Sequence, residues 1–204
     1  MINYLVVIFA ITLIYIAEAE RISTYVRLLA FQGILLCGIA IFELREVNLA
    51  NLLFIVAETL LFKATLLPYL LYRIIRKSGV TRVHRQSVPG FYLLLFSMAG
   101  LLISVTLSMI FANPFINSIY LAISLFTLYT GLLQIVTHKL IISHLIGFMV
   151  VENAVFLFSL AVGNDMPMLI NIGILLDLFV GVLILGFFGL KLKPLTSELN
   201  MLKD

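Results

Sequence analysis

Seven long apolar runs, separated by short polar breaks, constrain this sequence more than any other feature. The hydrocarbon core of a bilayer is about 30 Å thick, and roughly 20 helical residues cross it. An open sheet is excluded as the spanning element because it would leave backbone hydrogen-bonding groups unpaired in lipid. The runs therefore predict seven transmembrane helices, over residues 2–17, 22–42, 49–72, 90–112, 115–137, 140–163 and 167–190.

The composition supports a membrane protein and excludes several soluble classes. Apolar residues make up 63% of the 204 positions and charged residues 11%, whereas soluble domains average about 45–50% and about 25%. An ordinary soluble enzyme, a disordered chain and a disulfide scaffold are excluded, and the single cysteine, Cys37, can form no intrachain disulfide. The first run has no basic segment before it and no small-residue cleavage site after it, which predicts a retained helix.

The basic residues predict the orientation, because Lys and Arg are enriched in cytoplasmic connections. Only Arg45 falls on one side of the predicted bundle, and Lys63 lies within a run. We therefore expect an external N-terminus and a cytoplasmic C-terminus, and the segment Arg73–Arg85 is interpreted as a topology signal near anionic lipid and not as a nucleic-acid site. The other side carries Arg21, Arg27, Arg73, Arg76, Lys77, Arg82, Arg85, Lys139, Lys191, Lys193 and Lys203.

Four ionisable residues lie near the centres of predicted helices: Glu58, Lys63, Glu152 and Asp177. A charge at this depth costs about 2.5–3.5 kcal/mol on insertion scales. Because four such charges cannot face lipid, we expect them to form a polar seam inside the bundle or at a contact with another protein. Buried carboxylates and amines exchange protons, so the pattern predicts a proton relay.

The alternative is that these residues are interhelical hydrogen-bonding groups, which are worth only about 0.6 kcal/mol on average and need no charge. Three more residues are candidate supports for a relay. His144 lies eight residues before Glu152, about 12 Å toward the cytoplasmic side, although snorkelling toward the interface is the simpler interpretation. Asn153 can orient Glu152, and Gln32 can serve as glue or as relay.

No motif for autonomous chemistry is present in the sequence. There is no CxxC pair, His/Cys cluster, GxGxxG, P-loop or GxSxG. We therefore expect no cofactor, no metal and no catalytic residue; if the chain belongs to an enzyme complex, we expect it to be a non-catalytic subunit.

The chain also contains a weak internal repeat. Residues 27–33 (RLLAFQG) align with 144–150 (HLIGFMV), and residues 57–63 (AETLLFK) align with 176–182 (LDLFVGV), which places Glu58 on Asp177. Repeated helical units are common in membrane proteins that move ions. We expect two three-helix units, residues 1–77 and 113–204, joined by a basic loop and a connector helix over 78–112.

Two families resemble these segments. Residues 124–193 resemble the three-helix K subunit of bacterial complex I, through LIGFMVVENA (145–154) and through Asp177 with Val180 and Gly181 after it. The whole chain is similar to hydrogenase 4 component E, most specifically in KATLLP (63–68), GFMVVEN (147–153) and residues 172–177.

The resemblance implies a membrane subunit of a respiratory complex I-like or energy-converting hydrogenase assembly, in a bacterial or archaeal inner membrane. Its partners would be antiporter-like and other membrane subunits and a hydrophilic redox arm. The chain would contribute to translocation of protons or Na⁺ through Glu58, Lys63, Glu152 and Asp177. Two alternatives remain: a stand-alone proton-coupled transporter, whose sign would be a broken helix near Pro68, and a structural anchor without ion conduction.

Overall fold

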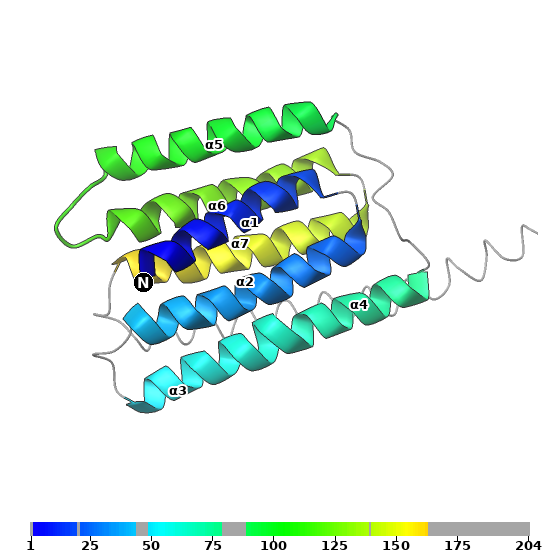
Figure 1. Cartoon of the computed structure of the whole chain (residues 1–204), viewed down its shortest axis with the longest axis horizontal. Helices are drawn as coiled ribbons and strands as arrows, with labels where there is room; N and C mark the ends of the chain where they lie inside the picture. Colours follow the sequence, from blue (N-terminus) through cyan, green and yellow to red (C-terminus); the bar gives the residue numbers. More distant parts are fainter. Residues whose placement is uncertain (1, 20, 44–48, 79–88, 139, 163–204) are drawn as a thin grey trace, which may run out of the picture.

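The computed structural model describes residues 2–19, 21–43, 49–78, 89–138 and 140–162. All the long elements among these residues are helices (Figure 1). Five helical segments in this part of the chain are long and apolar enough to cross a membrane, and a sixth apolar helix is shorter. The prediction of an all-α membrane protein is confirmed at this level. The elements are α1 (Ile2–Glu18), α2 (Ile22–Glu43), α3 (Leu49–Glu58), η1 (Thr59–Leu66), α4 (Leu67–Ser78), α5 (Gly90–Ile110), α6 (Ser118–Thr137) and α7 (Ile141–Val162).

Six of the predicted spans coincide with helices, and the differences have local causes. The helix expected from residue 115 begins at Ser118, because the Asn117 side chain accepts hydrogen bonds from the backbone N–H groups of Ile119 (3.1 Å) and Tyr120 (3.5 Å). The seventh predicted span, 167–190, lies outside the described residues, as does most of the basic loop.

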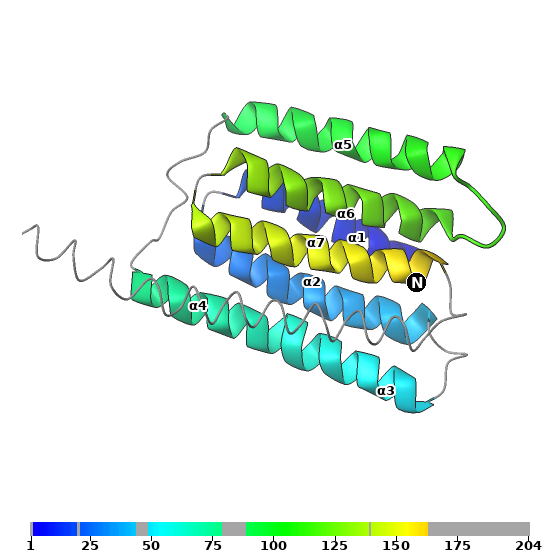
Figure 2. The ribbon, with the colours of Figure 1, turned by 180° about the vertical axis from the view of Figure 1, so that it is seen from behind.

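The helices lie lengthwise beside one another in a bundle (Figures 1 and 2). α5 lies along one side, α3, η1 and α4 lie along the opposite side, and α1, α2, α6 and α7 lie between them. In the most apolar stretch of each helix, 67% of the residues of α7 are buried, but only 28% of those of α5. α7 is therefore central and α5 peripheral.

Two glycines bring α6 and α7 together. A Cβ atom added to Gly131 would lie 2.9 Å from the Gly147 carbonyl oxygen, and one added to Gly147 would lie 2.8 Å from the Gly131 carbonyl oxygen. Small residues at such crossings allow two backbones to approach closely, which gives the dispersion contacts that hold helices together in lipid.

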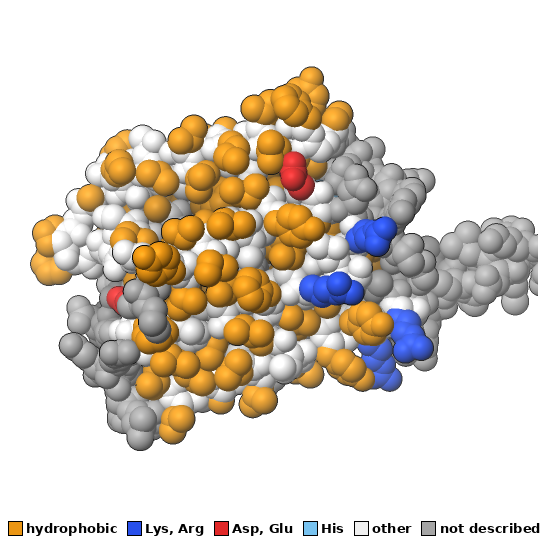
Figure 3. Space-filling view, viewed as in Figure 1, with side chains coloured by type: hydrophobic (Ala, Val, Ile, Leu, Met, Phe, Trp, Pro, Cys, Tyr) orange, Lys and Arg blue, Asp and Glu red, His pale blue; other side chains and the backbone are white. Residues whose placement is uncertain are grey.

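The surface separates apolar from basic side chains (Figure 3). Apolar side chains cover the length of the visible face, and Lys and Arg gather at one end. The exposed arginines Arg21 and Arg27 belong to the start of α2, and Arg73 and Arg76 to the end of α4. We call this end of the bundle the basic end; the positive-inside rule predicts that it faces the cytoplasm.

Candidate functional site

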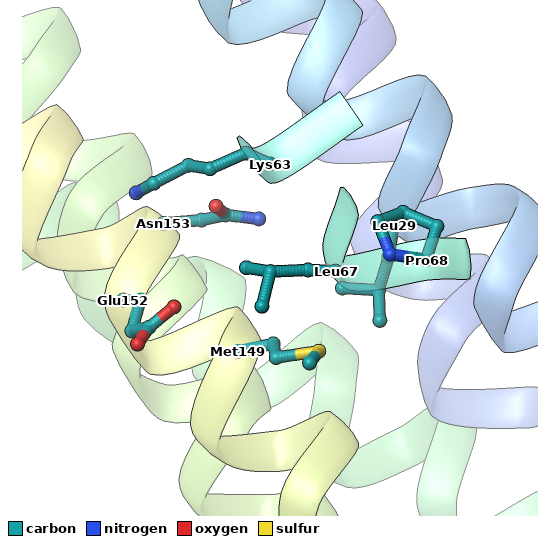
Figure 4. A pocket seen from close by; sticks show the side chains of 7 residues that line it. All are labelled: Leu29, Lys63, Leu67, Pro68, Met149, Glu152 and Asn153. Carbon is teal, nitrogen blue, oxygen red and sulfur yellow. The ribbon is translucent and has the colours of Figure 1, made fainter. Parts of the chain in front are cut away.

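A small pocket in the interior of the bundle is lined by polar and apolar side chains from α2, η1, α4 and α7 (Figure 4). Its charged and amide side chains are buried: Lys63 is 8% exposed, Glu152 4% and Asn153 5%. The space inside has room for roughly one water molecule. We call this site the central pocket; its lining consists of Leu29, Lys63, Leu67, Pro68, Met149, Glu152 and Asn153.

Lys63 reaches the central pocket from a π-helix and not from a regular α-helix. Pro68 follows this segment, and a proline has no N–H to donate and its ring collides with the carbonyl four residues before it. A locally widened helix relieves that collision, and π-helical turns often occur at functional sites. Within η1 the Thr59 hydroxyl donates to the Ile55 carbonyl at 2.6 Å, and the Thr65 hydroxyl donates to the Leu61 carbonyl. The helical path continues from Leu49 to Ser78, so it is altered but not unwound near Pro68.

Gly33 on α2 lets this π-helix lie directly against its neighbour. A Cβ atom on Gly33 would lie 2.8 Å from the backbone nitrogen of Ala64 and 2.9 Å from the carbonyl carbon of Lys63. These are backbone atoms, which cannot rotate away as a side chain can. The glycine therefore determines how closely α2 approaches the residue that carries the buried amine.

The Lys63 ammonium lies against α7. Its Nζ is 5.3 Å from the centre of the Phe156 ring, which is a cation–π contact. Phe156 follows Glu152 by four residues on α7, so the two share one helical face. The contact therefore holds the amine on the face of α7 that also carries the buried carboxylate.

A chain of hydrogen bonds runs from the central pocket across the bundle. The Asn153 Nδ2 group donates to Gln32 Oε1 at 3.1 Å, the Gln32 Nε2 group donates to Thr12 Oγ1 at 3.0 Å, and the Thr12 hydroxyl donates to the Phe9 carbonyl at 2.6 Å. Gln32 is 0% exposed, so these bonds satisfy an amide that has no access to water. The chain joins α7, α2 and α1 and fixes the orientation of the Asn153 amide, whose oxygen lies on the side of Lys63 in Figure 4.

The structure brings together four of the residues singled out in the sequence: Lys63, Glu152 and Asn153 line the central pocket, and Gln32 is bonded to Asn153. Glu58 ends α3, but the position of its side chain lies outside the described part of the structure. Asp177 also lies outside the described residues.

The remaining candidate, His144, does not reach the central pocket. It lies near the start of α7, and its Nε2 atom is 2.7 Å from the carbonyl oxygen of His138. The sequence analysis did not single out His138, which is buried at the end of α6. The sequence did contain a sign of this site: Gln134 and His138 are four residues apart, which places both on one helical face just before a basic break.

Other features of the central pocket were also missed in the sequence analysis. Thr12 and Phe156 carried no signal, because isolated threonine and phenylalanine residues are ordinary in apolar helices. Among the described residues, no group of three or more His, Cys, Asp or Glu side chains could hold a metal ion. The polar groups that line the central pocket are the Lys63 amine, the Glu152 carboxyl group and the Asn153 amide.

Comparison with known proteins adds no relative: no family model matches the chain, and no curated protein and no solved structure matches it.

Proposed function

We propose that this chain is a membrane-arm subunit that conducts protons within a complex I-like or energy-converting hydrogenase assembly, with the redox chemistry in partner subunits. The observation that supports this most is the burial of an amine and a carboxylate, Lys63 and Glu152, around one interior pocket. Burying two ions costs several kcal/mol each before they attract one another. Asn or Ser would join helices at far lower cost, so the titratable groups point to proton exchange.

The arrangement around the two groups suits transfer through a single water. Asn153 is held by Gln32, so its amide oxygen keeps one orientation beside the pocket. A water in the pocket would accept a hydrogen bond from the Lys63 ammonium and donate one toward the Glu152 carboxylate. The hydrogen-bonded groups run from α7 to α2 and α1, across the bundle, which suits lateral transfer toward neighbouring subunits.

The same pocket suits a proton better than Na⁺. A hard cation needs several oxygen ligands, and here one carboxylate and one amide oxygen are accompanied by the ammonium of Lys63. Like charges repel strongly where the local dielectric constant is low. We therefore propose H⁺ as the conducted ion, with Na⁺ conduction as the outcome that would contradict this choice.

The test uses the chain with an affinity tag, purified with its partners and reconstituted into liposomes. We expect Glu152→Gln and Lys63→Ala to reduce proton transport per redox turnover at least tenfold, because each removes one of the two exchanging groups. Glu43→Gln is the matched control, because Glu43 accepts a hydrogen bond from Tyr120 (2.8 Å) away from the pocket. Normal transport by both assembled variants would contradict the proposal.

The purification also separates the alternatives. Antiporter-like membrane subunits in the eluate support a place in a larger complex. Uptake of a solute by the chain alone would instead identify a transporter. If Lys63→Leu and Glu152→Leu together restored assembly that each single change impaired, with normal ion flux, the two residues would be an interface pair in a structural anchor.

A further inference from the structure

A second group of buried polar side chains lies at the basic end, where α6 ends and α7 begins. His138 and Gln134 are each 2% exposed. The Tyr25 ring of α2 meets the His138 ring edge-on, with 6.4 Å between the ring centres. Part of the hydrogen-bonding capacity of this group is unused, because His138 Nε2 has no hydrogen-bond partner among the described residues.

The hydrogen bonds of His138 determine which ring nitrogen carries the proton. Its Nδ1 is 3.1 Å from the Gln134 carbonyl oxygen, which can only accept, so Nδ1 is the protonated nitrogen of the neutral ring. The Thr137 hydroxyl, 3.0 Å from the same nitrogen, donates its own proton to the Leu133 carbonyl at 2.7 Å. The basic lone pair of His138 is therefore on Nε2.

The neighbouring histidine has the opposite arrangement. His144 Nε2 is 2.7 Å from the His138 carbonyl oxygen and therefore donates to it. The lone pair of neutral His144 is then on Nδ1. Two histidines thus meet at one end of the bundle, where the ring of His144 contacts the backbone of His138. Each has its tautomer set by a backbone carbonyl, and each has one nitrogen that can accept a proton.

We propose that His138 and His144 form a proton-loading site that supplies the central pocket from the basic end. A proton binds to Nε2 of His138 and leaves from the same nitrogen, because Nδ1–H stays bonded to the Gln134 carbonyl. The ring then returns to its original neutral tautomer. His144 lies on the same helix as Glu152, about 12 Å away along the axis. This inference rests on the proposed function of the central pocket.

The charges around the pair favour this role. Tyr25 from α2 and His144 from α7 are the titratable groups that face His138, and Arg21 is exposed at the start of α2. Burial lowers the pKa of His138, the hydrogen bond to the Gln134 carbonyl raises it, and charge on His144 lowers it. With its pKa below the ordinary value, His138 is neutral at pH 7.

The first experiment leaves both His138 and His144 unaltered. The full chain, labelled with ¹⁵N-histidine and placed in lipid nanodiscs, is titrated by NMR, with His84→Gln used to remove the third histidine signal. We expect neutral His138 at pH 7 with its proton on Nδ1, and protonation only below pH 6.5. A proton on Nε2, or a charged ring at pH 7, would overturn the loading site whatever the central pocket does.

The second experiment measures proton transport by the reconstituted complex between pH 6 and 9. We expect His138→Gln to slow transport at least fivefold at pH 8.5, where protons are scarce, and much less at pH 6, while His84→Gln leaves the profile unchanged. If Glu152→Gln abolishes transport and both His138→Gln and His144→Gln keep the normal profile, the inference fails and the proposed function stands. If Glu152→Gln has no effect, the proposed function fails, and the loading-site role fails with it.

Discussion

At the scale of single residues, the buried amides connect three helices at one level of the bundle. Gln32 accepts from Asn153 and donates to Thr12, so it uses both ends of its side chain. A leucine at this position would keep the volume and lose both bonds. The effect of that change shows how much of the bundle's stability depends on the chain of hydrogen bonds.

We expect Gln32→Leu to lower the free energy of unfolding by about 1 kcal/mol, since interhelical hydrogen bonds in membranes average about 0.6 kcal/mol each. Unfolding of the purified chain by SDS in bicelles measures it. Ser97→Ala is the control, because the buried Ser97 hydroxyl has no hydrogen-bond partner among the described residues and its loss should cost little. If Gln32→Leu and Asn153→Leu destabilise the protein independently, so that the double variant shows their full sum, the two residues do not interact.

His138 gives a pH-dependent contribution with a definite sign. Its pKa in the folded chain lies below the ordinary value of 6.5, chiefly because burial disfavours the charged ring. The unfolded state therefore binds the proton more readily, so the contribution is complete above pH 6.5 and is lost as pH falls toward the folded pKa. We expect the melting temperature to fall from pH 7 to pH 5 less steeply in His138→Gln than in the unaltered chain. Equal slopes would show that His138 does not contribute.

The sequence predicted that Lys63 and Glu152 lie inside the bundle, because a charge in the middle of an apolar run is too costly to leave facing lipid. The residues that they contact could not be predicted. α2 and α7 are apolar on all sides, so no polar face shows which way Gln32 or Asn153 points. The rotation of each helix is set by contacts such as Gly131 against Gly147, which join positions on different helices and leave no charge pattern in the sequence.

At the scale of elements, the π-helix η1 is the main departure from the sequence-based expectation. The sequence predicts a regular helix over 49–72, and Pro68 was the only mark of irregularity. The structure places the widened segment before Pro68, over Thr59–Leu66, and brings Gly33 into contact with its backbone. The sequence could not show this, because the apolar pattern of a run is much the same in an α-helix and in a π-helix.

Gly33→Ala tests the contact between α2 and η1. The added methyl group would lie within 2.9 Å of backbone atoms of Lys63 and Ala64, and overpacking typically costs about 1–3 kcal/mol. We expect that loss in stability and a shift of Lys63 away from α7. Gly38→Ala is the control: its nearest neighbour is the Leu5 side chain at 3.5 Å, an ordinary contact. Equal stability of the two variants would mean that α2 and η1 are not in close contact.

At the scale of the whole molecule, the basic end is one surface to which several elements contribute. The exposed arginines at the start of α2 and the end of α4 lie there (Figure 3). For α2 and α4 this agrees with the alternation of Lys and Arg along the sequence, and the compartment that the basic end faces stays a prediction. Packing order, with α5 outermost and α7 central, could not be predicted, because all the runs are similarly apolar.

The orientation in the membrane is tested with reporter fusions. We expect alkaline phosphatase to be active when fused after Asn113 and inactive when fused after Ser78, and a fluorescent protein to show the opposite pattern, because the positive-inside rule places the basic end in the cytoplasm. Activity on both sides of α5 would contradict a single crossing by that helix.

The position of α5 in the chain determines how the two helical hairpins of the bundle are oriented relative to each other. Two helical passages, α3–η1–α4 and α5, separate the helical hairpins α1–α2 and α6–α7, so both hairpins run in the same sense through the bundle (Figure 1). Had the chain passed directly from α4 to α6, the second hairpin would be inverted, and His138 would lie at the opposite end of the bundle from Arg21. A single peripheral helix, which contributes little to the interior, therefore places both hairpin bends at the same end of the bundle (Figure 1).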